Sequence, residues 1–191
     1  MPKTALAHLE DMLAGNARFA AGSAAIARAE LALGQAPFAV VLGCSDSRVP
    51  VETVFDRVPG EIFVARVIGG VVSDETLASV EFAVGVLNTP LVIVLGHTNC
   101  GAVKAAVDYV SDGITMPGHI GTAVSSIVAA ARATRDGEGD WWLRAVRENV
   151  RRNAAALEQR SSIVATAVRE RRALVKGLVY DLHTGKVTLE P

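Results

Sequence analysis

Two short segments of this chain contain the residue types best suited to chemistry. Residues 44–48 read Cys-Ser-Asp-Ser-Arg and residues 97–101 read His-Thr-Asn-Cys-Gly, and together they hold both cysteines of the 191-residue sequence. Cys44, His97 and Cys100 offer two thiolates and an imidazole, a set that favours Zn²⁺ over Mg²⁺ or Ca²⁺. Catalytic zinc sites commonly use three protein ligands and keep the fourth position for water or substrate. The sequence therefore predicts a Zn²⁺ cofactor held by these three side chains.

A possible acid–base pair follows the first of these ligands. Asp46 and Arg48 are close enough in a loop for the guanidinium to bind the carboxylate, keep it ionised and aim it. The carboxylate could then accept a hydrogen bond from water on the metal. It could instead occupy the fourth metal position itself, and the spacing alone leaves both roles open.

Each segment follows an apolar run that reads as a buried strand. Residues 38–43 are FAVVLG and residues 91–96 are LVIVLG, continuous runs of the kind that parallel sheets bury on both faces. Ligands of open α/β sheets bind beyond the carboxyl ends of the strands, where the strand order reverses. If these two strands are neighbours, Cys44 and His97 converge despite their separation in the sequence.

The rest of the chain alternates between strand and helix patterns. We therefore predict an α/β fold with a mainly parallel central sheet, about four parallel strands plus a C-terminal edge strand, flanked by helices. Residues 1–191 are expected to form one domain, in which residues 1–36 make an N-terminal helix and arm. Pro50 and Asp74 suit helix starts. The expected strands are 38–43, 61–67, 91–96, 174–181 and 186–190, and the expected helices are 4–20, 50–56, 75–87, one beginning near Cys100, 119–135, 140–159 and 161–172.

The composition argues against several classes of partner. The chain has 19 basic and 20 acidic residues and a net charge of −1, which offers no support for a nucleic acid or an anionic membrane. No apolar run approaches the ~20 residues of a membrane span. A mean hydropathy of +0.33 indicates buried parallel strands together with a sizeable subunit interface. The N-terminal residues lack a signal peptide's apolar block and the chain has few cysteines, so we expect a cytoplasmic location.

Together, the two segments resemble the signature of the β-class carbonic anhydrases. The resemblance extends from Gln35 through Lys104 and, weakly, through the last strands. It implies reversible hydration of carbon dioxide to bicarbonate and a proton by a zinc-bound hydroxide. A hydrolase of carbonyl sulfide or carbon disulfide on the same fold is the alternative. A non-catalytic zinc protein or bicarbonate sensor is a third interpretation.

The resemblance also implies roles for individual residues and a quaternary structure. It implies a homodimer or homotetramer whose pockets are built across the subunit interface, with Gln35 reaching the pocket of a partner subunit. The small-molecule partner would be CO₂ or bicarbonate. The implied zinc ligands are Cys44, His97 and Cys100, the implied catalytic dyad is Asp46 and Arg48, and the implied substrate-binding residues are Gln35, Phe63 and Gly101.

Several positions depart from the family's usual pattern. Residues 66–70 read Arg-Val-Ile-Gly-Gly, where the family usually shows Arg-Asn-Ala-Gly-Asn, so two amide side chains are missing. Phe82 stands where a tyrosine is common. Val41 replaces the tryptophan of members that have an allosteric bicarbonate site. We therefore expect an open fourth zinc position near neutral pH, with Asp46 paired to Arg48.

The expected helix over residues 140–159 has two further features. Trp141 and Trp142 are expected to anchor it on the body of the domain or on a dimer surface. Its four arginines are expected to form a solvated face. These arginines are Arg144, Arg147, Arg151 and Arg152.

Overall fold

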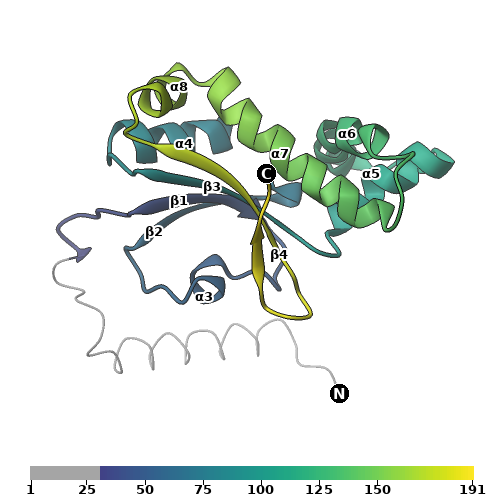
Figure 1. Ribbon diagram of the computed structural model, residues 1–191, viewed down its shortest axis with the longest axis horizontal. Coiled ribbons are helices and arrows are strands. Elements are labelled where there is room, and N and C mark those ends of the chain that lie inside the picture. Colours follow the sequence, from purple (N-terminus) through teal and green to yellow (C-terminus); the bar gives the residue numbers. More distant parts are fainter. Residues whose placement is uncertain (1–30) are drawn as a thin grey trace. The chain divides into compact units, whose positions relative to one another are not determined.

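A five-stranded sheet in the order β2-β1-β3-β4-β5 forms the centre of residues 31–191, the part of the chain that the computed structural model describes (Figure 1). β1 pairs in parallel with β2 and β3, β3 pairs in parallel with β4, and β5 is antiparallel to β4. This topology confirms the predicted mainly parallel sheet with a C-terminal edge strand. The strands are β1 (Ala39–Cys44), β2 (Ile62–Val67), β3 (Leu91–His97), β4 (Leu174–Tyr180) and β5 (Val187–Leu189).

The central strands are apolar because both of their faces are covered. All of β1 and most of β3 is buried, whereas burial is interrupted along the edge strand β2. Side chains alternate across the sheet, so Val40 and Leu42 enter the larger core and Val41 enters a smaller core on the opposite face. Two-sided burial thus accounts for the continuous apolar runs that predicted these strands.

Helices cover the two faces unequally. Figure 1 shows α4, α7 and α8 on one side of the sheet and the short α3 on the other. The larger core lies under the long helices, and the smaller one includes Val49, just before α3, and Val51, the first residue of α3. The helices of the described residues are α3 (Val51–Val54), α4 (Asp74–Gly85), α5 (Gly101–Asp112), α6 (Gly118–Ala133), α7 (Trp141–Arg160) and α8 (Ser162–Arg169), and the 3₁₀ turn η1 (Ile68–Gly70) follows β2.

The predicted helix starts at Pro50 and Asp74 need correction. Ser73 is the N-cap of α4, and with Thr76 it forms a capping box in which each side chain bonds the other's backbone N–H. Asp74 instead lies in the first turn, where it pairs with Arg160 at 2.7 Å. Pro50 precedes α3, which is shorter than expected.

The predicted solvated arginine face of α7 is only partly correct. Arg147 Nε lies 3.7 Å and Arg151 Nη1 lies 3.5 Å from the carboxylate of Glu190, whose side chain is 3% exposed. Arg144 donates to the backbone carbonyls that follow the end of α6. The helix pattern could not show this, because the acceptors come from the chain's C-terminal end and from a preceding loop.

The predictions for the N-terminal arm concern residues outside the described part of the chain. They include the helix over 4–20 and most of the arm over 1–36, so the single domain over 1–191 stays a prediction. Gln35–Pro191 forms one unit by itself. No helix among the described residues is both long and apolar enough to cross a membrane.

Candidate metal centre

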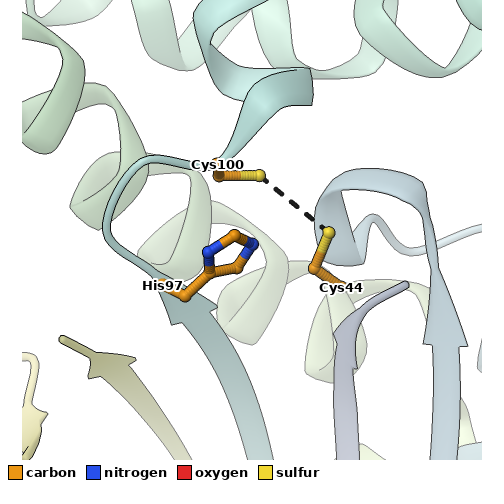
Figure 2. A group of neighbouring side chains, drawn as sticks. All are labelled: Cys44, His97 and Cys100. Atoms are coloured by element: carbon orange, nitrogen blue, oxygen red, sulfur yellow. Dashed lines mark hydrogen bonds between the residues drawn. The ribbon is translucent and has the colours of Figure 1, made fainter. Parts of the chain in front are cut away.

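The sheet topology brings the two cysteine segments to one edge. β1 and β3 are parallel neighbours, with Gly43 opposite Leu95, so their carboxyl ends lie side by side. Cys44 is the last residue of β1 and His97 is the last of β3. Cys100 is the N-cap residue of α5. The predicted convergence of the strand ends is confirmed, and Figure 2 shows the three side chains facing one another.

The three side chains fit a zinc ion in size and chemistry. Cys44 Sγ and Cys100 Sγ are 4.0 Å apart, and both thiols are free and buried. Two Zn–S bonds of about 2.3 Å at a tetrahedral angle place sulfur atoms roughly 3.8 Å apart. The two sulfurs and the imidazole nitrogen all lie within 4.8 Å of one another. His97 Nε2 is buried and has no hydrogen-bond partner among the described residues, so its lone pair is available to bind a metal ion.

The other imidazole nitrogen fixes which way His97 faces. His97 Nδ1 lies 2.9 Å from the carbonyl oxygen of Thr98. A carbonyl can only accept, so Nδ1 carries the proton and donates it. The lone pair of the ring is therefore on Nε2, which faces the cysteines. Metal-binding histidines are typically held in this way through their second nitrogen.

The two thiols share a hydrogen bond, which shifts their pKa values in opposite directions. The hydrogen bond with Cys100 lowers the pKa of Cys44 to about 4, with a smaller contribution from His97. The same bond, together with burial, raises the pKa of Cys100. The pair thus readily holds one thiolate, and a cation bound by both sulfurs must displace the remaining proton.

Asp46 and Arg48 form the bidentate pair that their spacing predicts. Asp46 Oδ1 accepts from Arg48 Nε at 2.9 Å and Oδ2 accepts from Nη2 at 2.8 Å, and the backbone N–H of Arg48 donates to Oδ1 at 3.0 Å. The Arg48 side chain holds the pKa of the Asp46 carboxyl well below its usual range. Asp46 Oδ2 lies 3.9 Å from His97 Nε2. An ionised, oriented carboxylate therefore lies beside the metal ligands.

Comparison with known proteins agrees with this geometry. The sequence model of the carbonic anhydrase family matches residues 39–187. "Carbonic anhydrase 2" of Mycobacterium tuberculosis is 38% identical over 185 residues, which cover 92% of this chain and 87% of the relative. The β-carbonic anhydrase CafA of Aspergillus fumigatus superposes with a TM-score of 0.86 at 30% identity, covering 95% of this chain and 90% of that structure. The chain belongs to the β-class carbonic anhydrase family.

A further similar structure comes from the filamentous ascomycete Sordaria macrospora, whose two β-class carbonic anhydrases are described as tetrameric. It superposes with a TM-score of 0.83 at 26% identity and covers 98% of this chain and 97% of that one. The similarity thus covers nearly the whole of that structure. The recognition of the β class from the two cysteine segments is confirmed.

Arg66 holds the backbone of the first ligand loop of this β-class enzyme. Its Nε donates to the carbonyl oxygen of Cys44 at 2.8 Å, and its Nη2 donates to that of Asp46. Both acceptors are backbone carbonyls, which carry no sequence signal.

The departures from the family pattern at residues 66–70 lie at the end of β2 and in η1, the turn that packs against β1. Gly69 and Gly70 have positive φ angles of 71° and 60°. A Cβ on Gly70 would lie 3.3 Å from the carbonyl carbon of Gly43, so glycine permits the close approach. Asn149 on α7 donates to the carbonyl oxygen of Gly69 at 3.0 Å. A buried amide thus reaches this turn from α7.

The three residues predicted to bind substrate lie in different environments. Gln35 is exposed before β1, and Gly101 is exposed at the start of α5. Phe63 is half-buried in β2, and its ring lies 6.1 Å from that of Phe82. No hydrogen bond of the described residues joins Gln35 to the metal ligands. Their roles in a pocket therefore stay predictions.

Sequence reasoning did not identify Thr98 as part of the site. Besides accepting from His97, Thr98 donates its backbone N–H to the carbonyl oxygen of Tyr180 at 2.9 Å. Its hydroxyl accepts from the backbone N–H of Leu182 at 3.0 Å. Its place directly after a ligand was the only available signal, because the partners come from the far end of the chain.

Proposed function

We propose that this chain is a carbonate dehydratase, a lyase that catalyses the reversible hydration of CO₂ to bicarbonate and a proton. Cys44, His97 and Cys100 would hold one Zn²⁺ through two sulfurs and Nε2. The observation that carries this proposal is the set of three donor atoms within 4.8 Å of one another, beside the Asp46–Arg48 pair. Membership of the β class supports CO₂ hydration as the reaction.

The chemistry divides between the metal and the side chains. A bound Zn²⁺ supplies a Lewis acid that lets a water molecule lose its proton near neutral pH. Asp46, 3.9 Å from His97 Nε2, accepts a hydrogen bond from the attacking water and so orients it. Arg48 keeps Asp46 ionised, because two charge-assisted hydrogen bonds favour the carboxylate.

The reaction balances without any further reactant. The oxygen of a water molecule forms a bond to the carbon of CO₂, one water proton goes to solvent, and bicarbonate leaves. In the reverse direction bicarbonate takes up a proton and releases water. Asp46 serves both directions as an acceptor.

The alternative substrates are less well supported. Carbonyl sulfide and carbon disulfide have the same linear geometry as CO₂ and would suit the same nucleophile. The relatives compared above are named carbonic anhydrases, which favours CO₂. A bicarbonate sensor without activity would not need the oriented carboxylate of Asp46.

We propose that the protein works as a homodimer or homotetramer in the cytoplasm. Gln35, Phe63 and Gly101 would then line pockets built across the subunit interface. The tetrameric Sordaria relatives and the exposed apolar side chains of Phe82 and Val86, at 46% and 61%, support an assembly. Light scattering tests it, since a fully active monomer would contradict it.

Two measurements on one sample decide the main proposal. Zinc is quantified on the purified protein, and the rate of CO₂ hydration is then followed by stopped flow on the same sample. We expect about one zinc per chain and an activity that a chelator abolishes and zinc restores. A sulfide-release assay with carbonyl sulfide is run in parallel, and hydrolysis without CO₂ hydration would replace the proposed substrate.

A further inference from the structure

The loop between β3 and α5 is held at each of its carbonyl oxygens by a different side chain. His97 Nδ1 lies 2.9 Å from the carbonyl oxygen of Thr98, and Arg48 Nη2 donates to that of Asn99 at 3.2 Å. Trp142 Nε1 donates to the carbonyl oxygen of Cys100 at 2.9 Å. The first two donors belong to the site itself. The third comes from α7, and the proposed chemistry gives it no role.

Cys100 needs such a contact because its backbone links two different conformations. Asn99 before it has a left-handed φ of 57°, and α5 begins directly after it. Cys100 itself is extended, with φ −66° and ψ 117°, and its side chain does not cap the helix. A change in the ψ angle of Cys100 would therefore move its side chain, and with it the sulfur, relative to α5.

We infer that Trp142 is a positioning residue that aims the Cys100 sulfur at the metal. Its indole N–H fixes the carbonyl of Cys100, which also accepts the first helical hydrogen bond of α5, from Lys104 at 3.0 Å. The thiol is thereby held 4.0 Å from that of Cys44. A ligand that is already oriented loses less freedom when the metal binds. This inference rests on the proposed zinc site.

The neighbouring residue provides a matched control within the same helix. Trp141 is also half-buried, and its Nε1 also donates to a backbone carbonyl, that of Ala131 at 3.0 Å. Ala131 lies in α6 and is not a metal ligand. Loss of either indole N–H should therefore have similar effects on packing, whereas only one of the two losses should affect the metal.

The experiment compares the zinc affinity of Trp142→Phe and Trp141→Phe by chelator competition, with unfolding measured on the same samples. Contacts behind a metal ligand typically change affinity by 10- to 100-fold. We expect at least about a 10-fold weaker zinc affinity for W142F. W141F should keep the wild-type affinity within about 2-fold even where its melting temperature falls, because the indole N–H of Trp141 binds the carbonyl of Ala131 and not that of a ligand. Equal affinities in the two variants would overturn the inference.

A fluorescence measurement keeps the test decisive if W142F does not fold. The chain has two tryptophans, so W141F leaves Trp142 as its only one. Stripping zinc from W141F should leave the emission of Trp142 nearly unchanged, because the indole holds the Cys100 carbonyl with or without the metal. A large shift in emission would show that the carbonyl is not held and would overturn the inference. A wild-type protein that binds no zinc would overturn the proposed function as well, which separates the two failures.

Discussion

The two loops that supply the metal ligands are stabilised by different forces. The loop over residues 44–48 is held by charge: Asp46 and Arg48 pair with each other, and the Arg66 guanidinium binds the backbone. The loop over residues 97–100 is held mainly by neutral groups, the hydroxyl of Thr98 and the indole of Trp142 among them. One loop is partly open to solvent and the other is anchored to distant elements.

The two kinds of contact suit two different tasks: one loop takes part in the reaction, and the other places metal ligands. The charged loop carries the carboxylate that orients the attacking water, so it has to stay polar and accessible. The neutral loop places an imidazole and a thiol, and fixed backbone hydrogen bonds suit that task because they do not vary with salt or pH. Apart from the metal ligands themselves, substitutions in the first loop should therefore change the reaction rate, and those in the second should change metal binding or stability.

The largest effect should come from removing one sulfur ligand from either loop. Cys44→Ser and Cys100→Ser each leave two protein ligands, so we expect both to lose most of the zinc and nearly all CO₂ hydration activity. Zinc analysis and stopped-flow hydration measure this. Ser47→Ala, at an exposed neighbouring position, serves as the control. Full zinc occupancy in either cysteine variant would refute the ligand assignment.

Asp46→Asn should separate the reaction rate from metal binding. The neutral amide of the variant cannot pair with the charge of Arg48. Zinc binding should persist, because residue 46 is not one of the three proposed zinc ligands. We expect zinc to stay bound and the hydration rate to fall by about 10²- to 10⁴-fold, the range for losing a positioned acid–base group. Asp56→Asn, an exposed carboxylate change, is the control. Wild-type turnover in D46N would exclude a catalytic role.

The sequence predicted those parts of the molecule that depend on local pattern. Continuous apolar runs predicted β1 and β3, and the rule for strand ends in parallel sheets placed Cys44 beside His97. The bidentate Asp46–Arg48 pair followed from a spacing within one loop. These features need no knowledge of distant contacts.

The missed features depend on contacts between distant segments or on backbone geometry. Two adjacent residues, Ser73 and Asp74, both suit a helix N-cap, and only the backbone conformation selects the serine. Trp142 and Thr98 form hydrogen bonds with backbone groups. Every residue has such groups, so the sequence does not show which of them is bound. Glu190 reaches the arginines of α7 from the end of the chain. Long-range packing decides each case.

Arg66→Lys should have a smaller effect on activity than D46N. A lysine keeps the charge, but a single ammonium cannot reproduce the guanidinium fork that binds the carbonyl oxygens of both Cys44 and Asp46. We expect about a 10-fold loss in kcat with zinc retained, since the carboxylate is present but less well oriented. Arg57→Lys, at an exposed position, should match the wild type. An effect as large as that of D46N would mean that Arg66 contacts the substrate.

Thr98→Val should have the smallest effect, on stability, and its dependence on pH distinguishes the two loops. The variant leaves the backbone N–H of Leu182 without its acceptor, which costs about 1 kcal/mol of unfolding free energy. Thr98→Ser keeps the hydroxyl and should recover most of this loss. Urea unfolding in the presence of a chelator measures both, so that metal release does not contribute.

The pH dependence follows from the sign of the Asp46 shift. Because Arg48 lowers the pKa of Asp46 in the folded state, the pair stabilises the protein above the unfolded pKa of about 3.9. That stabilisation is lost as the pH falls through the lower folded value. The stability difference between wild type and D46N should therefore shrink in acid. The difference between wild type and T98V should stay constant over the same acid range, because no charge is involved. A T98V penalty that shrinks in acid as much as that of D46N would show that both loops depend on charge.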